Sequence, residues 1–175
     1  PTTRSGCRFV ALGRITYEKG QHRLVDAVAK NAQALRAAGA TISVYGHDAR
    51  FASEVGTRHL LRARAREARI DDLLSCPGWT DDVDAVLADA DALVRTDESG
   101  CPWGRDVIEA MCSGLPVIAT GSVATFVQPE ETGLLVPPSD PEALGNALVR
   151  LATDLGMRRA MGERRRAFAR EHFDP

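Results

Sequence analysis

Short apolar segments alternate with amphipathic ones along this chain, and this alternation limits the fold more than any other feature of the sequence. The apolar segments cover residues 8–12, 41–45, 73–76, 92–94, 115–119 and 132–137. Nearly continuous apolar strands that alternate with helices are typical of parallel sheets covered on both faces. The sequence therefore predicts an α/β fold, a Rossmann-like three-layer sandwich with a parallel sheet of about six strands.

The amphipathic segments carry recognisable helix signals. Gly20 precedes a helix whose apolar face is formed by Leu24, Val28, Ala32 and Leu35. A polar helix is expected over residues 52–68, and Thr80 or Asp81 is expected to cap a helix that ends near residue 88. Residues 140–142, Asp-Pro-Glu, combine an N-cap with Pro at the first helical position and predict another helix start.

The loops after the strands are where we expect a ligand. In parallel sheets of this kind, ligands bind outside the carboxyl ends of the strands. The polar and Gly-rich segments of the chain fall in these loops, which cover residues 13–19, 46–50, 77–80, 95–105, 120–126 and 137–140.

Residues 100–119 read as a loop, a short helix, a tight turn and a buried strand. A helix that starts at a glycine-rich loop exposes unpaired backbone N–H groups and the positive end of the helix dipole, and both favour a phosphate. Glu109 lies about a turn and a half into this helix. Its carboxylate can accept hydrogen bonds from the hydroxyls of whatever carries the phosphate, so the segment predicts a nucleotide-like ligand.

Composition narrows the function further. The chain has 175 residues, which fits one domain over 1–175. Its 22 Lys and Arg against 24 Asp and Glu give a net charge of −2, so no bulk attraction to nucleic acid is encoded. Four cysteines without a C-x-x-C pair favour a reducing cytoplasm, and no apolar run approaches the roughly 20 residues that span a bilayer. Because the sequence does not begin with Met, we expect a fragment of a longer protein.

Several motifs, in order from about Phe9 to Phe173, resemble one family. The motifs are Gly13-Arg14-Ile15 with Lys19-Gly20, then Pro102-Trp103-Gly104 with Ile108-Glu109-Ala110-Met111, then residues 114–119 and 131–137. Together they resemble the C-terminal half of retaining glycosyltransferases of the GT-B fold, in the large family that contains sucrose synthase-like and lipopolysaccharide mannosyl- and glucosyltransferases (family 4, glycosyl transferases group 1). The resemblance implies a domain that binds a nucleotide-diphosphate sugar, with an N-terminal acceptor-binding domain absent from this chain.

The resemblance also implies catalytic roles for Arg14, Lys19 and Glu109. The two cations would neutralise the donor diphosphate, which builds negative charge as it leaves, and Glu109 would hold the ribose. Val83 would line the base pocket, and the transfer would need neither a metal nor a covalent cofactor. The residues implied to contact the donor are Gly13, Gly78, Trp79, Thr80, Glu98, Cys101, Trp103, Gly104 and Arg105.

Two segments depart from the family pattern on the sugar side of the donor. Cys101 stands where the first glutamate of the paired-glutamate motif falls, eight positions before Glu109, although Glu98 in the same loop is a candidate substitute. Residues 121–125, Gly-Ser-Val-Ala-Thr, replace the usual two glycines and later Glu. These departures keep open an alternative, a non-catalytic nucleotide-sugar-binding module or one chain of a split glycosyltransferase.

Other interpretations also stay open. Arg14 and Lys19 are alternatively ordinary surface charges, Trp79 and Trp103 are alternatively core anchors, and His47 lies on the binding edge. A nicotinamide-dependent dehydrogenase is disfavoured because the turn after the first strand lacks the Gly-x-Gly-x-x-Gly pattern.

The C-terminal segment is rich in arginine. A solvated amphipathic helix is the favoured interpretation, with Leu155, Met161 and Phe168 as its apolar stripe. The alternative is peripheral contact with an anionic membrane at its cytoplasmic face. The arginines concerned are Arg158, Arg159, Arg164, Arg165, Arg166 and Arg170.

Overall fold

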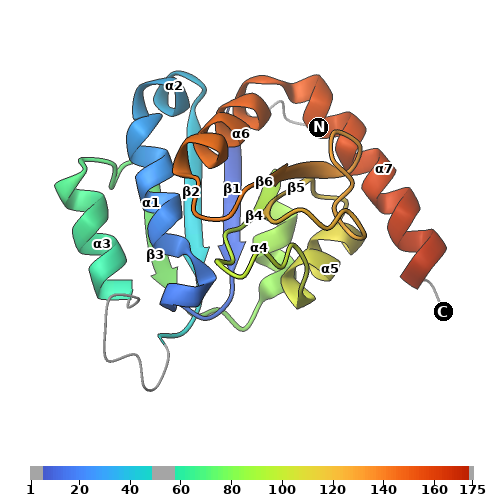
Figure 1. The fold of residues 1–175 in the computed structure, drawn as a ribbon, viewed down its shortest axis with the longest axis horizontal. Helices are drawn as coiled ribbons and strands as arrows, with labels where there is room; N and C mark the ends of the chain where they lie inside the picture. Colours follow the sequence, from blue (N-terminus) through green and yellow to red (C-terminus); the bar gives the residue numbers. More distant parts are fainter. Residues whose placement is uncertain (1–5, 49–57, 174–175) are drawn as a thin grey trace.

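A computed structural model describes residues 6–48 and 58–173. Six strands form one parallel sheet in the order β3-β2-β1-β4-β5-β6 (Figure 1). The strands are β1 (Cys7–Leu12), β2 (Ala40–Tyr45), β3 (Leu74–Gly78), β4 (Ala92–Arg95), β5 (Val117–Thr120) and β6 (Gly133–Val136). The predicted α/β class, the parallel sheet and the number of strands are confirmed.

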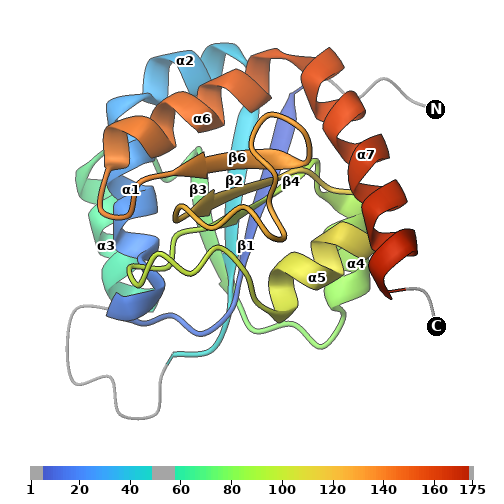
Figure 2. The same ribbon diagram turned by 45° about the vertical axis from the view of Figure 1, so that its right-hand side comes forward.

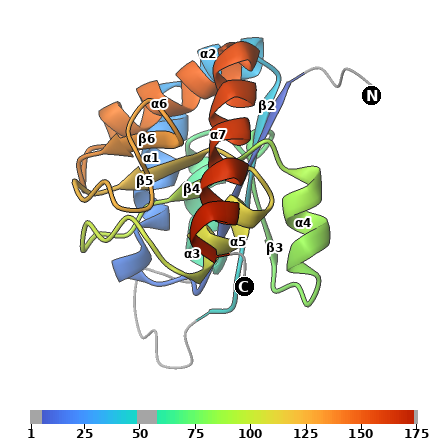
Figure 3. The ribbon, with the colours of Figure 1, turned by 90° about the vertical axis from the view of Figure 1, so that its right-hand side faces the viewer.

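Helices cover both faces of the sheet (Figures 2 and 3). One face carries α1 (Gln21–Lys30), α2 (Ala32–Ala37), α3 (Arg58–Glu67) and α6 (Pro141–Thr153), whose apolar residues share a core with Phe9 and Ile42. The other face carries α4 (Val83–Asp89) and α5 (Arg105–Cys112), which pack on Val10 and Leu93. The last helix, α7 (Leu155–Phe173), contacts α5 and α6. Neighbouring strand residues thus face opposite layers, as the pleat requires.

Several predicted boundaries are corrected by local chemistry. The helix after Gly20 is divided at Asn31 into α1 and α2, and α4 is capped by Asp82, not by Thr80 or Asp81, because the Asp82 carboxylate accepts from the Ala85 N–H. β3 continues through Pro77, which an edge strand tolerates because it needs fewer N–H donors. Of the predicted helix 52–68, residues 52–57 lie outside the described part. The Asp140 cap of α6 is confirmed.

The arginine-rich helix α7 is not a purely solvated helix. Arg165 has no exposed surface, and its guanidinium donates to the backbone carbonyl of Thr132 at 3.1 Å. Arg158 is also buried and donates to the carbonyls of Leu151 and Ala152 near the end of α6. Met161 is buried as predicted, but Leu155 is exposed and does not belong to the apolar stripe. Within residues 6–48 and 58–173, no helix combines the length and apolar character that crossing a bilayer requires.

Candidate functional site

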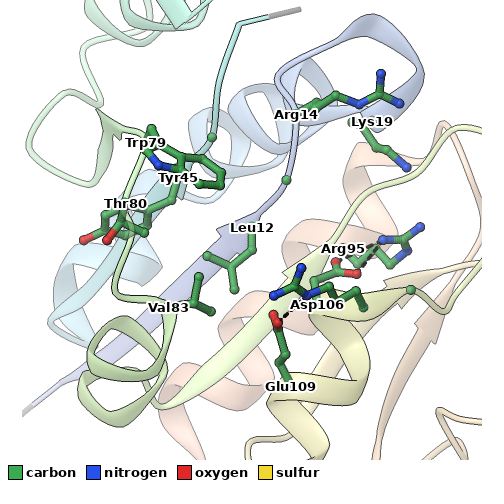
Figure 4. Close-up of a pocket in the computed structure, with 14 residues that line it drawn as sticks. Leu12, Arg14, Lys19, Tyr45, Trp79, Thr80, Val83, Arg95, Asp106 and Glu109 are labelled. Atoms are coloured by element: carbon green, nitrogen blue, oxygen red, sulfur yellow. Dashed lines mark hydrogen bonds and ion pairs between the residues drawn. The ribbon is translucent and has the colours of Figure 1, made fainter.

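A pocket of about 410 Å³ opens at the carboxyl ends of β1, β2 and β4 (Figure 4). This is the edge of the sheet at which the sequence places the ligand-binding loops. The residues that line it are Leu12, Gly13, Arg14, Lys19, Tyr45, Gly46, Trp79, Thr80, Val83, Arg95, Gly104, Arg105, Asp106 and Glu109. Cations and the start of α5 thus share one cavity with an apolar and aromatic wall.

The loop after β1 brings Lys19 to the pocket by a short 3-10 turn over Tyr17–Lys19. The Thr16 side chain caps this turn by accepting from the Lys19 N–H. Gly20 ends it in the left-handed region with φ 67°, and a Cβ there would lie 1.8 Å from the carbonyl oxygen of Thr96. Only glycine satisfies both constraints. Thr96 also donates its hydroxyl to the Lys19 carbonyl at 2.7 Å, so this loop is fixed against the loop after β4.

The Lys19 ammonium contacts Asp97, with 2.7 Å between Nζ and Oδ2. Asp97 is almost fully buried, and its other oxygen accepts from the N–H and hydroxyl of Ser99. Burial opposes ionisation of Asp97, but hydrogen bonds from Lys19 and Ser99, with the charge of Lys19, outweigh it and hold the carboxyl pKa below its usual value. Arg14, by contrast, is exposed on the outer part of the same loop.

A second ion pair lies where α5 begins. Arg95, the last residue of β4, donates from Nη1 to both carboxylate oxygens of Asp106, at 2.8 and 3.0 Å. The pair lies against Gly104, because a Cβ at that position would be 2.6 Å from Asp106 Oδ1 and 2.8 Å from Arg95 Nη1. The backbone of Gly104 is extended, with φ 172°, so lack of space, not backbone strain, requires glycine here.

Gly104 is the N-cap residue of α5 and makes no side-chain cap, which leaves the helix start open toward the pocket. Five residues after Gly104, Glu109 accepts from Nε of Arg105 at 2.7 Å, an i to i+4 pair in which the arginine side chain is 89% exposed. The predicted phosphate-binding and ribose-binding groups are therefore adjacent. An exposed pair of this kind contributes only about 0.3–0.5 kcal/mol, so a ligand can replace it at small cost.

The opposite wall of the pocket is formed by Trp79, Thr80 and Val83, together with Leu12 and Tyr45 (Figure 4). Trp79 is 56% exposed and stacks on His47, with 4.0 Å between ring centroids. Its indole N–H donates to Asp81. The interpretation of Trp79 as a core anchor is therefore wrong.

Four residues named from the sequence are not among the described residues that line the pocket. Gly78 holds a φ of 110° at the end of β3, and Trp103 is 48% exposed beside the ring of Phe126, so it is not a core anchor either. Cys101 accepts through its carbonyl from Arg95. Glu98 accepts from Nε of Arg23 at 3.1 Å and is also bonded to Ser139. The structure thus places the Glu98 carboxylate in a contact that joins the loop after β4 to α1 and to the loop before α6.

Sequence reasoning missed the charged network beneath the pocket, formed by Arg95, Asp97 and Asp106. An arginine at the end of an apolar strand and an aspartate in the first turn of α5 were the available signals, but neither indicates its partner. No group of three His, Cys, Asp or Glu side chains suited to a metal occurs in the described residues. Transfer without a metal remains a prediction.

Residues 6–154 match the family model for glycosyl transferases group 1. The lipopolysaccharide core biosynthesis glycosyltransferase LpsE of Rhizobium meliloti is 28% identical over 89% of this chain and 42% of its own length. The HepE structure from Anabaena in complex with UDP-glucose is 25% identical, has a TM-score of 0.82 and covers 95% of this chain and 44% of its own.

A third likeness is to a structure of a single domain. The C-terminal domain of the group 1 protein LpcC from Francisella tularensis has a TM-score of 0.83 at 20% identity, and the match covers 95% of this chain and 86% of that one. The chain thus spans less than half the length of LpsE and HepE but most of this domain. On the family match over most of its residues, the chain belongs to the glycosyl transferases group 1 family.

Proposed function

We propose that this chain is the donor-binding domain, one half of a GT-B fold, of a retaining glycosyltransferase that moves a hexose from a nucleotide-diphosphate sugar to an acceptor. The observation that carries the proposal is the division of the pocket. Lys19, Arg14 and the open start of α5 lie on one side, and the exposed ring of Trp79 lies on the other. A diphosphate suits the first side, and a nucleobase suits the second.

In the proposed reaction, cationic side chains stabilise the negative charge that develops on the leaving diphosphate. When the bond between the sugar and the diphosphate breaks, negative charge builds on the leaving oxygens, and Lys19 and Arg14 lie where they can stabilise it. Glu109 would accept hydrogen bonds from the ribose once Arg105 releases it. The acceptor, a glycan or lipid-linked saccharide, would be held by an N-terminal domain in the cytoplasm or at the inner face of the membrane. The HepE structure, which has a similar fold, contains UDP-glucose, and this supports a nucleotide-diphosphate sugar as the proposed donor.

Calorimetric titration tests donor binding. The panel consists of UDP-glucose, GDP-mannose, UDP, GDP and the matching nucleosides, titrated into the chain. We expect at least one diphosphate to bind and its nucleoside to bind more weakly, because the cationic side of the pocket has no partner in the nucleoside. Absence of binding to every nucleoside diphosphate would refute the proposed donor site.

A second candidate is a binding module without transfer activity, or one chain of a split enzyme. It is favoured by Cys101, which supplies no carboxylate, and by the engagement of Glu98 with Arg23 and Ser139 outside the pocket lining. Cys101→Glu in the full-length protein separates the two. Higher turnover in the variant supports a lost sugar contact, whereas full activity of the wild type refutes the binding-module hypothesis.

A further inference from the structure

Arg95 is held at the pocket more firmly than an ordinary lining residue. Only 11% of its side chain is exposed, yet it lines the cavity beside the start of α5. Its Nε donates to the Cys101 carbonyl at 3.0 Å, Nη1 binds Asp106, and Nη2 donates to Oδ2 of Asp97 at 3.1 Å. A guanidinium has five N–H donors, so these anchors leave one Nη2 hydrogen for another acceptor.

Asp97 brings Arg95 and Lys19 together. The Lys19 ammonium lies 2.7 Å from the same Oδ2 atom that accepts from Arg95. The other Asp97 oxygen is occupied by Ser99. Two cations that share one carboxylate oxygen are necessarily neighbours, although Lys19 lies in the loop after β1 and Arg95 lies at the end of β4.

This arrangement matches the chemistry of a diphosphate. A diphosphate carries anionic oxygens on two linked phosphorus atoms, and charge-assisted hydrogen bonds from adjacent cations are the strongest way to bind them. Arg95 also lies against Gly104, where the open start of α5 faces the pocket. Among the pocket-lining side chains, four are cationic (Arg14, Lys19, Arg95 and Arg105) and two are anionic (Asp106 and Glu109).

We propose that Arg95 binds the donor diphosphate together with Lys19, and that Asp97 is the positioning residue that holds these two cations side by side. The inference rests on the proposed function, because it names a further group in the same donor site. The opposing interpretation gives Arg95 a structural role alone, fastening the loop after β4 to α5.

The test compares Arg95→Gln with wild type in titrations with UDP, GDP, uridine, guanosine and inorganic pyrophosphate. Arg150→Gln is the matched control, because it removes an arginine that also binds a carboxylate through two bonds, to Glu130, away from the pocket. We expect Arg95→Gln to weaken the better-binding nucleoside diphosphate and pyrophosphate by about 10- to 100-fold, the loss typical of a hydrogen bond to a charged group. Nucleoside binding and the Arg150→Gln control should stay at wild-type values.

Each outcome has a separate meaning. If wild type binds neither UDP nor GDP, the proposed function fails. Suppose that wild type binds one of them. If Arg95→Gln binds that diphosphate equally well, or if the variant weakens nucleoside binding as much as diphosphate binding, the proposed role of Arg95 is wrong while the donor site stands. Should Arg95→Gln not fold, Arg95→Lys replaces it, because lysine keeps the charge without the fixed fork of donors. A loss of affinity confined to the diphosphates supports the proposal. Unchanged diphosphate affinity, or an equal loss of nucleoside affinity, overturns it.

Discussion

The lack of space at Gly104 makes Gly104→Ala an informative substitution. The added Cβ would lie 2.6 Å from Asp106 Oδ1 and 2.8 Å from Arg95 Nη1, whereas ordinary contacts of a Cβ begin at about 3.4 Å. The side chains of Arg95 and Asp106 must therefore move away from residue 104. Both are nearly buried, with 11% and 12% of their side-chain surface exposed. Because φ at Gly104 is 172°, alanine adds no backbone strain.

The expected loss follows from these contacts. Breaking a buried ion pair costs about 3–5 kcal/mol, and displacing one without breaking it costs a fraction of that. Alanine is also a poorer N-cap residue than glycine, by about 0.5–1 kcal/mol. We therefore expect Gly104→Ala to lower the free energy of unfolding by about 2 kcal/mol and to weaken UDP binding, because the start of α5 shifts with the ion pair.

Urea unfolding followed by circular dichroism measures the first effect, and calorimetry measures the second. Gly156→Ala in α7 is the control, because its Cβ would approach only the Asp154 carboxylate, at 3.3 Å, on the protein surface. That variant should be as stable as wild type or slightly more stable, because alanine has a higher helix propensity than glycine. Equal stability and equal UDP affinity of Gly104→Ala and wild type would refute the reasoning about the ion pair.

Three further predictions concern single charged groups. Lys19→Ala should weaken UDP binding by about 1.5–3 kcal/mol and leave uridine binding unchanged in calorimetry; equal UDP affinity of the variant and wild type would contradict its assigned role. The folded pKa of Asp97 lies below its usual value, so ionised Asp97 stabilises the folded protein above about pH 4, and this contribution is lost as pH falls through the folded pKa. Urea midpoints measured from pH 6 to 2 should therefore fall less steeply in Asp97→Asn than in wild type. Arg165→Met should lower the free energy of unfolding in urea by about 2–4 kcal/mol, whereas Arg164→Met, at an exposed neighbouring position, should change this free energy by less than about 0.5 kcal/mol. Equal effects of the two substitutions would favour the interpretation of α7 as a solvated helix.

The fold was predictable from the sequence because its signals are local and repeated. Four of the six strands contain at least three consecutive apolar residues, and signals such as Asp140 before Pro141 fix a helix start without tertiary information. Helix boundaries were predicted wrongly where neighbouring residues offered the same capping chemistry. Thr80, Asp81 and Asp82 can all cap a helix, and only the geometry of the turn selects Asp82.

The candidate site was predictable only in its loops. Position after a strand places Lys19 and Trp79 at the same edge of the sheet, as the pocket lining shows. The partners of a charge are not encoded locally, however. Lys19 and Asp97 are 78 residues apart in the sequence and meet only because β1 and β4 are neighbours in the sheet. The burial of Arg158 and Arg165 was not predicted for the same reason: these are two of the six arginines on α7, and their acceptors are backbone carbonyls that any residue supplies.

Most of the cations at the pocket already have protein partners, which changes what ligand binding requires. Lys19 and Arg95 contact Asp97, and Arg105 contacts Glu109. A diphosphate therefore does not meet free charges, but must add to or replace existing contacts. The Arg105 pair is exposed and cheap to replace, whereas the buried Asp97 pairs are not. Binding should accordingly move Arg105 and leave Lys19 and Arg95 in place, so Glu109 becomes available to a ribose only when a phosphate draws Arg105 away.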